Sequence, residues 1–218
     1  MEPEFWLQRW EAGQTGFHLD EVNRHLEQHW PQLGLHAPAG VFVPLCGKSL
    51  DLLWLRGQGH AVLGVELSPK AVEAFFAENG LQPAVLPRPP FVDWHLDGLN
   101  ILQGDFFDLE PDDTAECWGL WDRASLIALP PGMRARYAAH LTRLMPHGCR
   151  GLLVTLEYPQ AQMDGPPFSV EGDEVERLFG GDWAITPLAE HDVLEEQPRF
   201  RERGLEWLTE RIWRMERR

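Results

Sequence analysis

The chain has 218 residues, which is enough for one domain with a sizeable hydrophobic core and short for two. Hydrophobic residues make up 44% of it and charged residues 24%, with 10 Trp and 11 Phe, and this composition excludes a disordered chain. The 34 acidic residues outnumber the 19 Lys and Arg, so the formal net charge is -15. Because such a surface repels phosphate backbones and anionic lipids, nucleic acids and membranes are poor partners.

The cysteines and the N-terminal residues indicate the compartment. Cys46, Cys117 and Cys149 are odd in number and form no C-x-x-C pair, which predicts neither a disulfide framework nor a cysteine zinc site. The nine histidines show no metal-ligand spacing, so we expect no metal. Residues 1–11 contain no continuous apolar stretch, and no apolar run elsewhere approaches the length of a bilayer span. We therefore expect a cytoplasmic protein, and a monomer.

The chain begins with a segment that predicts a flank before the main fold. Apolar residues at helical spacing predict an amphipathic helix over residues 19–30, within a flank or lid formed by residues 1–35. Residues 41–43 are a short β-prone run, followed by a turn and by a helix that Ser49 can cap. This is the first strand–turn–helix unit.

A second unit follows directly. Residues 61–65 predict a buried strand, and Ser68 with Pro69 predicts the start of a helix that stops at Gly80. Further along, the pattern predicts strands over residues 99–103, 119–121 and 152–156 and a helix over residues 133–145. This alternation predicts an α/β protein with a doubly wound, mainly parallel sheet, and a single domain over residues 1–218.

Three segments depart from the alternation. The proline-rich residues 83–90 and 159–167 predict loops over one core. In residues 205–213, apolar and charged residues mix without helical spacing, which predicts a late antiparallel strand.

The turn after the first strand, residues 44–49 (PLCGKS), is a candidate ligand loop, because open α/β sheets bind ligands at the carboxyl ends of their strands. A phosphate-binding loop requires a glycine five residues before Gly47, and that position is Phe42. The G-x-G-x-x-G pattern is missing too. The missing glycines exclude an NTPase and disfavour NAD and FAD as cofactors, but they do not disfavour a cofactor without phosphates. The alternative is that residues 44–49 form an ordinary turn that binds no ligand.

Glu66 ends the second strand and is a candidate for a nucleoside ligand. It lies 19 residues after Gly47, where nucleoside-binding folds place an acid that accepts both ribose hydroxyls. The alternative is an acid at a strand end, next to the helix start at Ser68.

Two later strands also end in candidate residues. After the third, Asp105 can accept a hydrogen bond from an adenine amino group, with Phe106 against the ring; a loop acid and core phenylalanines are the alternative. After the fourth, Arg123 can pair with the carboxylate of an amino-acid-like ligand; a surface pair with Asp122 is the alternative.

The N-terminal residues 6–18 place three aromatic side chains, Trp6, Trp10 and Phe17, around glycines. Aromatic faces can stabilise a sulfonium cation and exclude water, although aromatic residues in such a segment are more often core. His18 is a candidate general base, or a structural histidine at a helix start.

Six segments resemble the thiopurine S-methyltransferase family in its bacterial form: residues 10–18, 42–49 (FVPLCGKS), 59–68 (GHAVLGVELS), 104–109 (GDFFDL), 121–130 (WDRASLIALP) and 165–170 (GPPFSV). The resemblance covers nearly the whole chain. It implies a Rossmann-like fold and S-adenosylmethionine as the cofactor. It also implies the residues that bind this cofactor: Trp10, Leu45, Glu66, Asp105, Phe106 and Arg123.

The resemblance further implies the substrates. Members of the family methylate aromatic and heterocyclic thiols such as thiopurines, and bacterial members are linked to selenium and tellurium compounds, which suggests detoxification. The family's second substrate-side arginine maps near Arg199 or Arg201. Aromatic heterocyclic thiols ionise more readily than a cysteine, whose pKa is about 8.5, so no strong general base is demanded, and Arg123 is a candidate stabiliser of the thiolate.

Two other classes of protein remain as alternatives. A non-catalytic module that binds S-adenosylmethionine or another nucleoside would use the same crevice, and turnover of a thiol separates it from an enzyme. A nicotinamide oxidoreductase is disfavoured by the missing glycine pattern.

Overall fold

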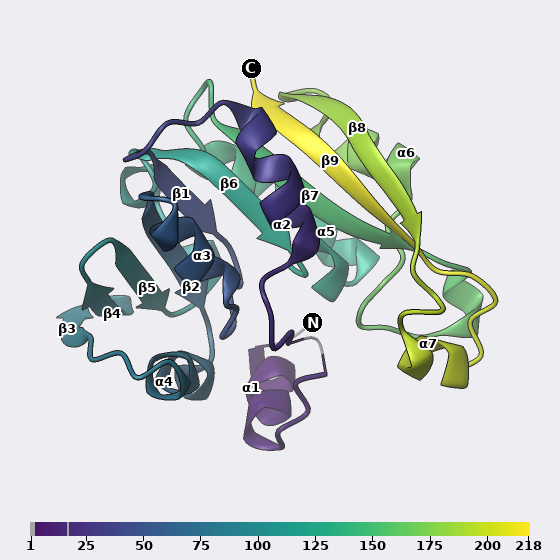
Figure 1. Ribbon diagram of the computed structural model, residues 1–218, viewed down its shortest axis with the longest axis horizontal. Helices are drawn as coiled ribbons and strands as arrows, with labels where there is room; N and C mark the ends of the chain where they lie inside the picture. Colours follow the sequence, from purple (N-terminus) through teal and green to yellow (C-terminus); the bar gives the residue numbers. More distant parts are fainter. Residues whose placement is uncertain (1–2, 17) are drawn as a thin grey trace.

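The strands form a nine-stranded sheet in a computed structural model that describes residues 3–16 and 18–218 (Figure 1). The strands are β1 (Gly40–Val43), β2 (Ala61–Glu66), β3 (Ala84–Arg88), β4 (Phe91–Leu96), β5 (Leu99–Gln103), β6 (Cys117–Arg123), β7 (Arg150–Glu157), β8 (Trp183–Asp192) and β9 (Thr209–Arg217). The helices are α1 (Pro3–Glu11), α2 (Arg24–His29), α3 (Asp51–Gly57), α4 (Pro69–Glu78), α5 (Pro131–Leu144), α6 (Gly172–Phe179) and α7 (Pro198–Glu202).

The centre of the sheet is parallel and its edges are antiparallel. The strand order is β3-β4-β5-β2-β1-β6-β7-β9-β8, and neighbours from β5 to β7 run parallel. Strands β3 and β4 form a hairpin at one edge, and β9 runs antiparallel to both β7 and β8 at the other. The predicted doubly wound, mainly parallel sheet with a late antiparallel strand is confirmed.

Both edge strands were missed by the sequence analysis. The prediction of a loop over residues 83–90 is wrong, because β3 occupies most of it. All five residues of β3 are exposed and Pro87 lies among them, so no alternation of buried and exposed residues marks a strand. Pro87 is tolerated because an edge strand has a free side where a missing N–H costs nothing. In β8, Pro187 lies at a register shift on the opposite edge.

Local signals define the second strand–turn–helix unit as predicted. The Ser68 side chain accepts a hydrogen bond from the N–H of Ala71 at 3.3 Å, with Pro69 at the first helical position of α4. The chain leaves the helix at Gly80, whose φ of 64° suits a residue without Cβ.

Helix α2 is shorter than the predicted helix over residues 19–30. It begins only at Arg24, because the side chain of Asn23 accepts a hydrogen bond from the N–H of His25 at 2.9 Å and Asn23 itself stays extended. The 3₁₀ helix η1 (Trp30–Leu33) continues it. Helix α1 is part of the predicted N-terminal flank, but its helical form was not predicted.

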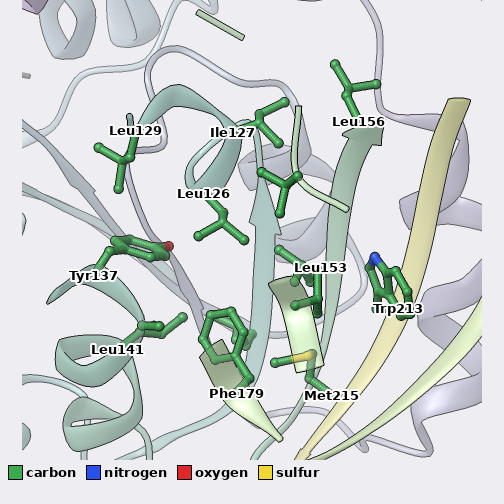
Figure 2. Close-up of a cluster of buried hydrophobic side chains, with 14 of the residues drawn as sticks. Leu126, Ile127, Leu129, Tyr137, Leu141, Leu153, Leu156, Phe179, Trp213 and Met215 are labelled. Carbon is green, nitrogen blue, oxygen red and sulfur yellow. The ribbon is translucent and has the colours of Figure 1, made fainter. Parts of the chain in front are cut away.

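Hydrophobic clusters cover both faces of the sheet. Val41 and Val43 of β1 belong to the cluster with α2, α3 and α4, whereas Phe42 belongs to the cluster with α5 and α6. In Figure 2, Tyr137 of α5 and Phe179 of α6 pack in this second cluster with residues of β7 and β9. Burial on both faces explains why the central strands are nearly continuous apolar runs.

The fold brings the carboxyl ends of β1, β2, β5 and β6 to one edge of the sheet. Helix α1 lies next to this edge, at the bottom of the view in Figure 1, and contacts α4. None of the helices in the described residues is long and apolar enough to cross a membrane. The residues that follow β1, β2, β5 and β6 therefore lie together at this edge of the sheet, next to helix α1.

Candidate active site

A cavity of about 450 Å³ lies at the carboxyl ends of the parallel strands. Small-molecule sites span about 300–1,000 Å³, so this volume suits a cofactor and a small substrate. The wall contains all six residues that the sequence analysis assigns to the cofactor: Trp10, Leu45, Glu66, Asp105, Phe106 and Arg123. Within the described part of the chain, no group of three or more His, Cys, Asp or Glu side chains could hold a metal ion.

Backbone strain is concentrated in this wall. Leu45 and Ala124 have φ angles of 47° and 66°, and among the described residues they are the only non-glycine residues with positive φ. Both line the cavity, in the turns that follow β1 and β6. A left-handed residue with a Cβ costs about 1–2 kcal/mol. Strain of this kind gathers at functional sites, so the turns after β1 and β6 are shaped for what the cavity holds.

The turn after β1 packs directly on the N-terminal helix. Gly47 has a φ of 54°, and a Cβ placed there would lie 3.3 Å from the ring of Trp10. Trp10 is itself only 5% exposed. Glycine therefore allows Trp10 to close the cavity wall over the turn.

Glu66 is buried at the end of β2 and holds two backbone amides. Its Oε2 accepts the N–H of Gly47 at 2.9 Å, and its Oε1 accepts the N–H of Ser68 at 2.8 Å. Burial raises the pKa of Glu66, and the hydrogen bonds from Ser68 and Gly47 counteract the rise. Each carboxylate oxygen keeps a second lone pair, so the group can shape the turn and still accept two hydroxyls of a ligand.

Asp105 and Phe106 follow β5. The sequence left two interpretations for them, an adenine site or a loop acid with a core phenylalanine, and the structure has features of both. The Oδ1 of Asp105 accepts the N–H of Phe107 at 2.9 Å and caps the 3₁₀ helix η2 (Phe106–Asp108). Phe106 stacks on Phe42 with ring centroids 6.4 Å apart and contacts Tyr137 at 4.9 Å. Phe106 is thus a core residue that also lines the cavity.

Asp122 and Arg123 point to opposite faces of β6, which excludes a surface pair between them. Asp122 is 1% exposed and its Oδ2 accepts a hydrogen bond from the hydroxyl of Tyr137 at 2.7 Å. Arg123 is half-buried in the cavity wall. Burial lowers the pKa of Arg123, and the negative charges of Asp51 and Glu210 oppose this effect.

The buried Asp122 gives a prediction for stability. Burial raises its pKa from the usual 3.8 to about 6, so the folded protein holds this proton more tightly than the unfolded chain does. The contribution of Asp122 to stability is therefore fully present below pH 4 and is lost as the pH rises through 6, with a total of about 3 kcal/mol at about 1.4 kcal/mol per unit. We expect Asp122→Asn to lack this loss.

Urea unfolding at pH 4.5 and pH 7.5 measures the effect in both proteins. From pH 4.5 to pH 7.5, the free energy of unfolding of the wild type should fall more than that of Asp122→Asn. A constant difference between the two proteins would contradict the raised pKa.

The substrate-side arginine of the family was placed near Arg199 or Arg201, and the structure separates the two. Arg199 lies at the rim of the cavity, whereas Arg201 is exposed and pairs with Glu195. Arg203, which the sequence analysis missed, also lines the rim. Helical spacing from Arg199 could have identified it, since residues four apart share one face of a helix. Partial removal from water, together with the charges of Arg123 and Arg203, lowers the pKa of Arg199.

The N-terminal segment supplies the remaining side of the wall. Trp6 and Trp10 of α1 line the cavity, and so does His18, whose pKa is lowered by burial and by the charge of Lys48. A Cβ on Gly16 would lie 3.2 Å from the guanidinium of Arg199, so this segment reaches the rim. Phe17, the third aromatic residue of the predicted cluster, lies outside the described residues.

Solved structures share this arrangement of the sheet. The chain is similar to an S-adenosylmethionine-dependent methyltransferase from Anabaena variabilis, with a TM-score of 0.69 and 13% identity over 99% of this chain and 95% of that one. It is also similar to the 1,6-didemethyltoxoflavin-N1-methyltransferase of Burkholderia thailandensis, which holds S-adenosylhomocysteine, with a TM-score of 0.62 and 19% identity over 97% of this chain and 86% of that one. The chain therefore has the Rossmann-like fold of these methyltransferases, with its cavity at the carboxyl ends of the parallel strands.

The family follows from closer relatives. The family model for thiopurine S-methyltransferase matches residues 1–218, and the chain belongs to this family. It is 54% identical to the thiopurine S-methyltransferase of Pseudomonas fluorescens (strain Pf0-1) over 99% of both chains. The protein of the same name from Azotobacter vinelandii is 54% identical over the full length of both. The resemblance in the sequence, the enzyme class and the cofactor are thus confirmed.

Proposed function

We propose that this chain transfers the methyl group of S-adenosylmethionine to the sulfur of aromatic and heterocyclic thiols, thiopurines among them. The observation that carries the proposal is a cavity whose wall holds two kinds of charged group. It contains the carboxylates of Glu66 and Asp105, and it also contains the guanidinium groups of Arg123, Arg199 and Arg203. The first suits a nucleoside, and the second suits anionic groups.

The wall fits S-adenosylmethionine group by group. Glu66 has free lone pairs for the two ribose hydroxyls, and the second oxygen of Asp105 can accept from the adenine amino group, with Phe106 as the apolar neighbour. Arg123 suits the carboxylate of the amino-acid part, next to Leu45 and Trp10. When bound, S-adenosylmethionine supplies a methyl group activated on a sulfonium sulfur.

The chain contributes mainly position and charge to the transfer. The substrate sulfur donates its electron pair to the methyl carbon while the bond to the sulfonium sulfur breaks, which yields a thioether and S-adenosylhomocysteine. Arg123 and Arg199 favour the thiolate form, which is the better nucleophile. His18, with its lowered pKa, is neutral at neutral pH and can accept the proton of a thiol that enters uncharged.

The two arginines of α7 provide a matched pair of variants. We expect Arg199→Met to raise the KM for the thiol about tenfold, because a charged partner of the thiolate contributes about 1.5–3 kcal/mol and the rim position is partly screened by water. Arg201→Met removes the same charge from the exposed face of the same helix, where it pairs with Glu195, and should leave KM unchanged. Initial rates at saturating S-adenosylmethionine measure both. Equal KM values for the two variants would remove Arg199 from the substrate site.

Methyl transfer to a panel of acceptors tests the function itself. Thiopurines, substituted thiophenols, selenite and tellurite are incubated with S-adenosylmethionine, and the methylated products and S-adenosylhomocysteine are quantified. Turnover of aromatic thiols is expected, and selenium and tellurium compounds are proposed as further acceptors. Binding of S-adenosylhomocysteine without turnover of any acceptor would favour the non-catalytic module.

We propose further that the enzyme acts as a cytoplasmic monomer in the detoxification of such compounds. The net charge of -15 supports the absence of nucleic acid and membrane partners. Light scattering of the purified protein should give the 25.0 kDa of one chain.

A further inference from the structure

Two acidic side chains, Glu210 and Asp51, act on the charge of Arg123, and of these Asp51 also lines the cavity whereas Glu210 does not. In the sheet, Arg123 of β6 lies opposite Val154 of β7, and Val154 lies opposite Ile212 of β9. Because alternate residues of a strand share a face, Glu210 projects from the same face of β9 as Ile212 does. Helix α2 crosses this face of the sheet (Figure 1), where Leu26 packs in one cluster with Val154 and Ile212.

Glu210 is held in place by α2. Its Oε2 lies 2.6 Å from Nε2 of His25, a residue that is 2% exposed. Burial alone would raise the pKa of Glu210, but the hydrogen bond and charge of His25 and the charge of Arg123 lower it below its usual value. The lowered pKa keeps Glu210 ionised, between its hydrogen-bond partner on α2 and the charge of Arg123 in the cavity wall.

Asp51, at the start of α3, is the other acid whose charge acts on Arg123. Its Oδ2 accepts a hydrogen bond from the indole of Trp121 at 2.8 Å, and Trp121 precedes Arg123 by two residues on the same face of β6. Its Oδ1 accepts the N–H of Asn23, the cap of α2, at 2.8 Å. Both carboxylates that balance the charge of Arg123 thus also anchor the first turn of α2.

We propose that Glu210, oriented by His25, is a positioning residue that fixes the guanidinium of Arg123 in the cavity. Glu210 is not among the described residues that line the cavity, so it acts through Arg123 and not on a ligand. A guanidinium donates in one plane, and its hydrogen bonds to a carboxylate or a thiolate require one orientation. A fixed counter-charge behind it selects that orientation before the ligands arrive, which lowers the cost of binding.

A double-mutant cycle tests the proposal. Glu210→Gln keeps the shape and removes the charge, and Arg123→Met removes the group on which it acts. We expect Glu210→Gln to lower kcat/KM for thiol methylation about tenfold in the wild-type background and to have no further effect in Arg123→Met, because a residue that acts only through Arg123 has nothing to act on once that side chain is gone. Glu190→Gln is the matched control, since Glu190 pairs with Arg211 on the same sheet edge away from the cavity, and it should behave as wild type.

A merely structural Glu210 gives a different result, namely the same loss in both backgrounds together with a lower Tm. That outcome, or an unchanged kcat/KM in Glu210→Gln, overturns the proposal. If Glu210→Gln does not fold, His25→Phe is measured in the same two backgrounds with the same expectation, because it leaves the carboxylate and removes the ring nitrogen that orients it.

The inference rests on the proposed function, and a second readout keeps the two apart. The dissociation constant of S-adenosylhomocysteine, measured by calorimetry in the same four proteins, reports on Arg123 without turnover. Failure of every thiol as acceptor would overturn the substrate proposal alone. Additive losses of S-adenosylhomocysteine affinity would overturn the role of Glu210 alone.

Discussion

Arg123→Met is expected to reduce kcat/KM for thiol methylation about a hundredfold, the largest effect of any single change in the cavity wall. The variant loses a charged hydrogen-bond donor, which contributes about 1.5–3 kcal/mol, and leaves the buried Asp51 and the ionised Glu210 without their cation. Initial rates over both substrates measure the loss, and the far-ultraviolet circular dichroism spectrum shows whether the fold is kept. Wild-type kcat/KM would exclude Arg123 from the site.

Arg123→Lys separates the two roles that the geometry allows for this residue. Lysine keeps the charge but loses the planar fork, so pairing with the cofactor carboxylate weakens and the KM for S-adenosylmethionine rises. If Arg123 also faces the thiolate, kcat falls in addition, and it falls most for thiols of higher pKa, which depend more on a nearby cation to ionise. We expect both effects. A kcat that stays constant in the Lys and Met variants across a thiol series would restrict Arg123 to the cofactor.

The strand–turn–helix units could be predicted because their signals are local. A buried apolar run, a Ser-Pro pair and a glycine stop lie within 20 residues at β2 and α4, and each acts on its own neighbours in the chain. The candidate site followed from the same units, since parallel strands bring the residues at their carboxyl ends to one edge. For this reason Glu66, Asp105 and Arg123 were found to share a cavity.

The features that could not be predicted from the sequence depend on contacts between segments that lie far apart in the chain. His25 and Glu210 are separated by 185 positions, and Asn23 and Asp51 by 28, so no spacing in the sequence connects them. Residue types alone do not reveal such pairs, because a histidine on an apolar helix face is usually structural. The hairpin β3–β4 was missed for another reason: an exposed edge strand has no buried side to produce alternation.

Glu66 can have both of the roles that its position in the sequence suggested. One interpretation made it a ribose acceptor, and the other made it an acid at the start of a helix. The carboxylate accepts the N–H groups of Gly47 and Ser68 and thereby ties the turn after β1 to the start of α4. The same turn packs on Trp10, so this part of the cavity wall and the N-terminal helix depend on one buried group.

Glu66→Ala is expected to weaken the binding of S-adenosylhomocysteine by about 2 kcal/mol, or about thirtyfold in the dissociation constant, since hydrogen bonds to a charged acceptor contribute about 1.5–3 kcal/mol. Calorimetry measures the change. Glu73→Ala is the control, because Glu73 is exposed on α4 and its loss should leave the affinity unchanged. An unchanged dissociation constant in Glu66→Ala would leave this residue with its structural role alone.

A deoxy analogue of the ligand separates the contact with the ribose from the effect on the turn. The wild type should bind S-adenosylhomocysteine more tightly than its 2′-deoxy form, because one oxygen of Glu66 loses its hydroxyl partner. If Glu66 accepts from the ribose, this preference disappears in Glu66→Ala, whereas a residue that only shapes the turn would weaken both ligands equally and keep the preference. Glu66→Gln should also bind poorly, because the carboxylate accepts backbone N–H groups at both oxygens, and the glutamine NH₂ would meet one of those donors with another donor.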